Sequence, residues 1–141
     1  MSEADTLARR VAAEMLRREG AGPAWGVTID DAREGHARIR MVVRDHMLNG
    51  HRIAHGGMIF ALADTAFAYA CNSRNESTVA QNATISFLAQ AQAGEVLVAE
   101  AREASRSARS GVYHVSVRTV DGGMIAEFTG LSRTIGGAVI N

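Results

Sequence analysis

A long apolar segment in the middle of the chain, from His55 to about Ser73, most constrains what this sequence can fold into. Between Gly56 and Cys71 it contains one charged residue, Asp64, and the apolar residues are spread all round a helical wheel. A helix that is apolar on every side is stable only when it is buried on several sides. The rest of the chain must therefore supply a cover that surrounds this helix.

The sequence outside this helix is mostly β-strand in pattern. Residues 3–19 are the exception, because their apolar positions follow helical spacing and Ser2 is placed to cap the helix. Residues 31–35 are expected to form a turn and residues 45–54 a polar loop. The expected strands are Trp25–Asp30, His36–Arg44, Thr78–Ala89, Glu95–Ser105, Gly111–Val120 and Met124–Ile135.

Turns of hairpin length separate most of these strands, so the strands should pair antiparallel. We therefore predict an α+β protein with the hotdog arrangement, in which an antiparallel sheet of about five or six strands wraps around one long central helix, with an N-terminal helix. A ferredoxin-like or cystatin-like fold would need a second long core helix in the latter half, and the sequence has none there. One domain spanning residues 1–141 is expected.

Composition narrows the range of partners. Basic and acidic residues number 15 each, so no basic excess indicates a nucleic-acid surface. The single cysteine, Cys71, excludes an internal disulfide framework and fits a reducing compartment. The first twenty residues lack the apolar core of a signal peptide, and the apolar helix is too short and too charged to span a membrane. A cytoplasmic protein without nucleic-acid or membrane partners is the expectation.

Asp64 is the first candidate for chemistry. An ionised carboxylate buried without partners costs several kcal/mol. Asp64 therefore pairs with a buried arginine, caps a neighbouring element, or serves as a general base or nucleophile. Its neighbours on the helix carry no basic side chain, so the helix itself cannot supply a partner. The surrounding sequence favours the chemical role.

Gly56 and Gly57 begin the same helix, where backbone N–H groups are free and the helix dipole is positive. They either form an oxyanion hole or allow a tight turn. Gly56 and Asp64 are eight residues apart, about 12 Å along a helix that rises about 1.5 Å per residue. Two groups acting on one carbonyl must lie within about 3–3.5 Å of the reacting atoms. A second copy running antiparallel would bring Gly56 to the other chain's Asp64, which predicts a homodimer with shared sites.

The loop before the helix holds further polar candidates. His46, His51 and His55 lack the spacing of a metal motif, so no metal is expected, and His55 is the best placed to contact a substrate. Asn49 either shapes the loop or orients a water or a carbonyl. Elsewhere, the arginines of the segment 105–110 are either solvated or hold a phosphate. Cys71 is expected in the core.

Three segments, Met47–His51, His55–Gly57 and Leu62–Ala68, closely resemble the hotdog thioesterases of the phenylacetic-acid-degradation type, PaaI. The likeness extends over residues 25–137. It implies hydrolysis of acyl-CoA thioesters, with (hydroxy)phenylacetyl-CoA or a related aryl-CoA as substrate. It also implies that no cofactor is needed, because CoA is part of the substrate, and that dimers pair into a homotetramer.

The same resemblance implies roles for individual residues. Asp64 would be the general base or nucleophile, the Gly56 N–H would form the oxyanion hole, and His55 and Asn49 would position the carbonyl or the water. Substrate or CoA contacts are implied for Gly57, Thr65, Thr84, Arg109 and Ser110.

Two short stretches depart from the family pattern, and both lie where CoA is expected to pass. Ala89–Gln90 stands where relatives often have Arg-Pro, and Ser107–Ala108 where they often have Gly-Lys. Two alternatives to a thioesterase are considered. A hotdog hydratase would need an Asp-x-Asn-Pro-x-His string, which is absent, and a non-catalytic acyl-CoA binding module would have no need of Asp64.

Overall fold

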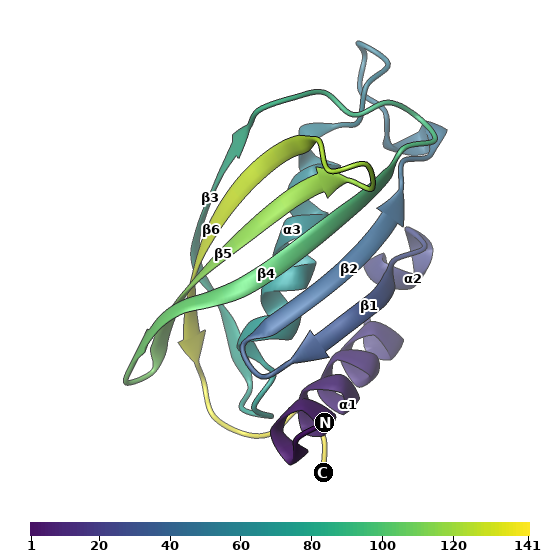
Figure 1. Cartoon of the computed structure of the whole chain (residues 1–141). Helices are drawn as coiled ribbons and strands as arrows, with labels where there is room; N and C mark the ends of the chain where they lie inside the picture. Colours follow the sequence, from purple (N-terminus) through teal and green to yellow (C-terminus); the bar gives the residue numbers. More distant parts are fainter.

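Helix α3 (Gly56–Cys71) lies in the hollow of a curved antiparallel sheet of six strands (Figure 1). The computed structural model describes all of residues 1–141. The sheet order is β1-β2-β4-β5-β6-β3. Its strands are β1 (Thr28–Arg33), β2 (His36–Val42), β3 (Thr78–Phe87), β4 (Val96–Ser107), β5 (Ser110–Thr119) and β6 (Met124–Thr134). The predicted hotdog fold is confirmed.

The N-terminal helix α1 (Glu3–Arg18) packs beside β1 at one edge of the sheet (Figure 1). The Ser2 hydroxyl caps it by accepting a hydrogen bond from the Asp5 N–H at 3.0 Å. A four-residue helix, α2 (Ala21–Ala24), follows where the sequence indicates only the end of α1. The loop before α3 begins with a short 3-10 helix, η1 (Asp45–Met47).

The first strand differs most from its prediction, because β1 covers Thr28–Arg33 rather than Trp25–Asp30. Trp25 closes α2 by donating its N–H to the carbonyl of Ala21 at 2.9 Å, so the strand begins later. A bulge after Ile29 then shifts the register, and the strand continues through most of the expected turn at residues 31–35. The bulge buries Asp31, whose carboxylate is paired with Arg9 at 3.2 Å and Arg33 at 2.9 Å.

The remaining boundaries differ from the predictions by one or two residues. Helix α3 ends at Cys71 rather than near Ser73, because the Asn72 amide bridges the Ala68 carbonyl and the Thr78 carbonyl at 2.9 Å each. The chain therefore turns at Asn72 and enters β3.

Aromatic side chains fix α3 against the middle of the sheet. The Phe67 ring lies 5.5 Å from the Tyr113 ring and 5.7 Å from the Phe128 ring, measured between centroids. Gly130 on β6 makes this contact possible, since a Cβ there would lie 2.7 Å from Phe67. Side chains of α3 thus approach the sheet closely enough to hold the helix in one position.

No helix in the structure combines the length and the apolar character needed to cross a membrane.

Candidate active site

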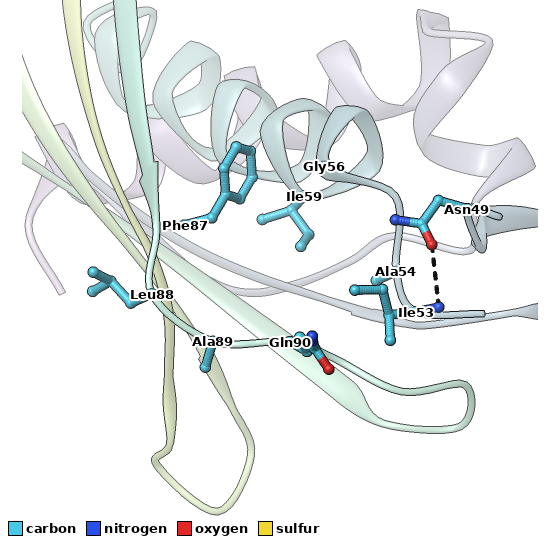
Figure 2. A pocket seen from close by; sticks show the side chains of 9 residues that line it. All are labelled: Asn49, Ile53, Ala54, Gly56, Ile59, Phe87, Leu88, Ala89 and Gln90. Atoms are coloured by element: carbon cyan, nitrogen blue, oxygen red, sulfur yellow. Dashed lines mark hydrogen bonds between the residues drawn. The ribbon is translucent and has the colours of Figure 1, made fainter. Parts of the chain in front are cut away.

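A pocket of about 330 Å³ opens beside the first turn of α3 (Figure 2). The loop before α3 forms one wall, the start of α3 forms a second, and the segment that follows β3 forms the third. Its lining is mostly apolar: Asn49, Ile53, Ala54, Gly56, Ile59, Phe87, Leu88, Ala89 and Gln90. Such a pocket suits an apolar ligand that a few polar groups orient.

Gly56 supplies a free N–H to this pocket. The N–H groups of Met58 and Ile59 donate to the His55 carbonyl at 2.9 and 3.2 Å, and the Gly57 N–H donates to the His55 ring at 2.8 Å. The Gly56 N–H is the one N–H of the first turn that makes no hydrogen bond within the chain. With the positive end of the helix dipole behind it, this group can bind a negatively charged oxygen.

His55 caps the helix instead of pointing a free nitrogen into the pocket. Its Nδ1 accepts the hydrogen bond from Gly57, which requires that the proton of the neutral ring be on Nε2. Histidine is not among the residues that usually cap helices, so the sequence did not predict this bond. The Gly57 N–H, predicted to contact the substrate, is therefore already occupied.

Asn49 is held by the loop that it shapes. Its Oδ1 accepts the N–H of His51 at 2.9 Å and the N–H of Ile53 at 3.4 Å (Figure 2). The sequence left two roles open for Asn49: to shape the loop, or to orient a water or a carbonyl. The side chain can do both, because its carbonyl oxygen shapes the loop while its NH₂ has no partner in the chain. That NH₂ lines the same pocket as Gly56.

Phe87 lies over the start of α3 and forms the wall opposite Asn49 (Figure 2). A Cβ on Gly56 would lie 3.1 Å from its ring, so a side chain at position 56 would push the ring aside by a few tenths of an ångström. Phe87 and the adjacent Leu88 leave 52% and 59% of their surface exposed in the single chain. The pocket is therefore open on the side of these two residues.

Asp64 is two turns farther along α3 and does not line this pocket. Its side chain is half-buried and takes part in no ion pair, and desolvation by burial raises its pKa above the ordinary value. Asp31, the other substantially buried aspartate, has two arginine partners. An ion pair with an arginine was one of the roles considered for Asp64 from the sequence. In the structure, Asp31 has such pairs and Asp64 has none.

Arg109 and Ser110 lie at the opposite end of α3 from the pocket. They line a narrow polar cleft with Cys71, Arg74 and Arg106 among others. Burial, together with the nearby charge of Asp64, raises the pKa of the Cys71 thiol to about 12, so this cysteine is protonated at neutral pH. Arg106 and Arg109 sit beside the turn between β4 and β5, as the sequence indicated.

The other predicted contact residues lie outside the pocket. The Thr65 hydroxyl donates to the Ala61 carbonyl at 2.7 Å, and Thr84 is exposed on β3. His46 and His51 lie in the loop before α3, and no three His, Cys, Asp or Glu side chains converge as metal ligands would.

The apolar wall of the pocket was not predicted from the sequence. Ile53, Phe87 and Leu88 line it together with Gln90. Alternating residues in β3 predicted a strand, but the pocket arises where that strand ends and the chain folds back toward Ala54. A hydrogen bond of 2.8 Å from the Ala54 N–H to the Ala91 carbonyl joins these two distant segments. No short-range pattern indicates such a contact.

Comparisons with known proteins agree with this fold. The model of the Thioesterase superfamily matches residues 51–126, a stretch that contains both Gly56 and Asp64. The acyl-coenzyme A thioesterase PaaI of Escherichia coli K12 is 41% identical over 125 residues, which cover 89% of each chain.

Two solved structures are similar over most of the chain. The E. coli PaaI protein from the phenylacetic acid degradation operon has a TM-score of 0.94 at 39% identity, covering 96% of this chain and 99% of that one. A mutant of the phenylacetic acid degradation protein PaaI from Thermus thermophilus has a TM-score of 0.80 at 33% identity, covering 83% and 100%.

Proposed function

The chain belongs to the thioesterase superfamily and is a thioester hydrolase, and we propose that it releases CoA from phenylacetyl-CoA, hydroxyphenylacetyl-CoA or a related aryl-CoA thioester. The observation that carries the site assignment is the unpaired N–H of Gly56 in an apolar pocket, on the same helix as an unpaired, desolvated Asp64. An aryl group suits this pocket because most of its lining is apolar. CoA enters as part of the substrate, and no separate cofactor is proposed.

The active site is completed by a second copy of the chain. Gly56 and Asp64 lie on one continuous helix, about 12 Å apart at about 1.5 Å per residue, so one chain cannot bring both to a single carbonyl. One face of α3 is left incompletely covered by its own sheet, and it carries small residues on both sides of Asp64. These residues are Gly57, Ala61, Thr65 and Ala68. Small side chains allow two antiparallel helices to approach closely.

The exposed edge of the sheet supports the same assembly. Strand β3 pairs only with β6, so its other edge is free. Most of its residues are exposed, and Val79 and Phe87 leave 47% and 52% of their surface in contact with solvent. A free strand edge with apolar side chains is a surface for pairing with another strand. We assign it to the homodimer, and pairing of two dimers would give a homotetramer.

In this dimer the reaction uses groups from both chains. The thioester carbonyl accepts the Gly56 N–H of one subunit, and the carboxylate of Asp64 acts from the other. Asp64 either takes a proton from a water whose oxygen attacks the carbonyl carbon, or attacks that carbon itself to form a mixed anhydride that water then hydrolyses. In both routes the Gly56 N–H stabilises the negative oxygen, the C–S bond breaks and CoA leaves as the thiolate. The Asn49 NH₂ is placed to orient the water or the carbonyl.

Antiparallel pairing also suggests where the rest of CoA lies. If Gly56 faces Asp64, the end of α3 near Cys71 in one subunit faces the Asn49 loop of the other. The polar cleft with Arg109 and Ser110 then adjoins the pocket of the opposite subunit, where its guanidinium groups can bind phosphate. Thr65 lies on the same face of α3 as Asp64, and Thr84 lies on β3, so both remain proposed contact residues of this dimer. The proposed setting is the cytoplasm, where a lone thiol stays reduced.

Release of thiol from phenylacetyl-CoA, followed with a chromogenic disulfide, tests the assignment. Replacing Asp64 by Asn should lower kcat by roughly 10²- to 10⁴-fold while the circular dichroism spectrum stays unchanged. The exposed Asp121, in the turn between β5 and β6, provides the matched control, and Asp121→Asn should retain full activity. An Asp64→Asn enzyme with a normal rate would refute the role of this carboxylate. Binding of the CoA ester without turnover by the wild type would instead identify a binding module.

A single turnover in ¹⁸O-labelled water tests the anhydride route. If the carboxylate attacks and water then opens the anhydride at the aspartyl carbon, the label enters Asp64 and the released acid carries an unlabelled oxygen from Asp64. Label in the released acid with none in Asp64 excludes this sequence of steps and is the result expected when water attacks the acyl carbon.

A further inference from the structure

The segment after β3 is held at both ends and leaves one residue free between its anchors. The N–H groups of Leu88 and Ala89 donate to the carbonyl of Ile125 at 2.8 and 3.2 Å, and the Ala91 carbonyl accepts the Ala54 N–H at 2.8 Å. Ala91 is fully buried. Gln90, between these anchors, is therefore fixed in its backbone while its side chain remains free to move.

Gln90 is the one residue of the pocket whose hydrogen-bonding groups are all unused. Neither its backbone N–H and C=O nor its side-chain amide bonds to another group in the chain. Asn49, by contrast, uses its carbonyl within its own loop, and Gly56 offers only a donor. Gln90 thus presents donors and acceptors together on the wall of the pocket that faces Ile53 and Ala54 (Figure 2).

We propose that Gln90 is a positioning residue that binds an amide of the pantetheine arm of CoA, the arm that ends in the reacting sulfur. This inference rests on the proposed thioesterase function. A secondary amide carries one N–H donor and one C=O acceptor, which match the NH₂ and C=O of a glutamine side chain. The free backbone N–H and C=O of Gln90 add a second such pair, as a strand edge does for an extended peptide.

The position of Gln90 favours the thiol side of the substrate over the acyl side. Gln90 is exposed at the rim, whereas the apolar residues nearest the helix, Ala54 and Ile59, are buried. The acyl group gains most from the buried apolar surface. The pantetheine arm must leave the pocket for the solvent, and its first amide follows the sulfur after only two carbons. When the thioester carbonyl lies at the Gly56 N–H, this amide is the first polar group of the pantetheine arm to reach the rim of the pocket.

The test compares two thioesters that share the phenylacetyl group. One is phenylacetyl-CoA, and the other is the ethanethiol ester, whose thiol has no amide. Replacing Gln90 by Leu removes the side-chain amide and leaves an apolar side chain one atom shorter. This change should lower kcat/KM for the CoA ester about three- to tenfold and leave that for the ethyl ester unchanged. The inhibition constant of pantetheine should rise by the same factor, whereas that of phenylacetate should not change.

Gln92→Leu is the matched control, because Gln92 is an exposed glutamine of the same loop that does not line the pocket. It should alter none of these values. An equal loss for both esters, or no loss for either, would overturn the inference while leaving the thioesterase assignment intact. If the wild type releases no thiol from any acyl-CoA, the proposed function fails instead, and calorimetric binding of pantetheine to wild type and Gln90→Leu still decides the role of Gln90.

Discussion

At the residue scale, the stability of the fold favours a neutral Asp64, whereas the proposed reaction uses its charged form. A carboxylate half-buried on an apolar helix, with no ion pair in its own chain, destabilises the fold when it is charged. The proposed reaction requires that charged form. Asp31 is buried more deeply, yet its two arginines pair with its carboxylate. The contrast between the two aspartates supports the choice of Asp64 as the candidate better than burial alone would.

This conflict predicts a gain in stability when Asp64 is neutralised. Because burial raises the pKa of Asp64 in the folded protein, folding favours the protonated form, so this group's favourable contribution is lost as pH rises through its folded pKa. Asp64→Asn should therefore have a higher Tm than the wild type at pH 7, and the difference should shrink as pH falls toward the ordinary pKa of aspartate. Thermal unfolding followed by circular dichroism at several pH values measures this.

Glu127→Gln is the control for net charge, since Glu127 is exposed on the outer face of the sheet. It should give no comparable rise in Tm. A lower Tm for Asp64→Asn at neutral pH would show that groups across the dimer interface stabilise the charged carboxylate.

At the scale of elements, sequence pattern predicted those features that depend on local periodicity. The burial of α3, the alternation along β2 and the capping of α1 by Ser2 each depend on residues a few positions apart, and all three are observed. The bulge in β1 was not predicted, and the Asp31 that it buries pairs with Arg9 of another element, a contact that no local pattern indicates. Helix α2 contains Gly and Pro, which favour turns in isolation, so local propensity also failed there.

The free edge of β3 allows a direct test of the proposed dimer. Asn82 lies near the middle of β3 and is exposed, whereas the adjacent Ala83 packs against the core. Asn82→Lys should convert dimers to monomers, because two charges would meet across the two-fold axis at a strand edge. Size-exclusion chromatography with light scattering measures the mass, and activity should fall in parallel.

Val42→Lys is the corresponding control, since Val42 is exposed on β2, far from the β3 edge. It should leave the dimer and the activity intact. A fully active monomer of Asn82→Lys would exclude a shared site.

At the scale of the whole molecule, the candidate site was predictable only in part. Gly56 and Asp64 were found because both belong to one helix and their separation follows from its rise per residue. Phe87 and Gln90 were not assigned, because they meet the helix start only after β3 has crossed the length of α3. The proposal of a second chain followed from the distance between Gly56 and Asp64 alone.

Mixing two inactive variants tests this whole-molecule prediction. Asp64→Asn removes the carboxylate, and Gly56→Pro removes the proposed oxyanion N–H, because proline lacks this group and fits the first position of a helix. Half of the dimers in an equal, randomly exchanged mixture contain one chain of each kind, and each such dimer has one intact site. The mixture should recover about one-quarter of wild-type activity.

Co-refolding the two variants ensures exchange of subunits, and the thiol-release assay measures the rate. Each variant refolded alone serves as the control. If the mixture stays as inactive as its components, both groups act within one chain and the shared site is wrong.

The strand order also determines when each part of the chain can fold during synthesis. Strand β3 is made third but has β6, made last, as its only partner within the chain, with Thr78 opposite Thr134. Until β6 leaves the ribosome, β3 has no strand to pair with, and the apolar side chains of α3 and β3 are incompletely covered. Such unpaired strand edges are prone to aggregate. Cells that overproduce this protein should therefore depend on a chaperone that shields nascent chains. The reason is that β3, whose end lines the proposed site, stays unpaired until β6 has been made.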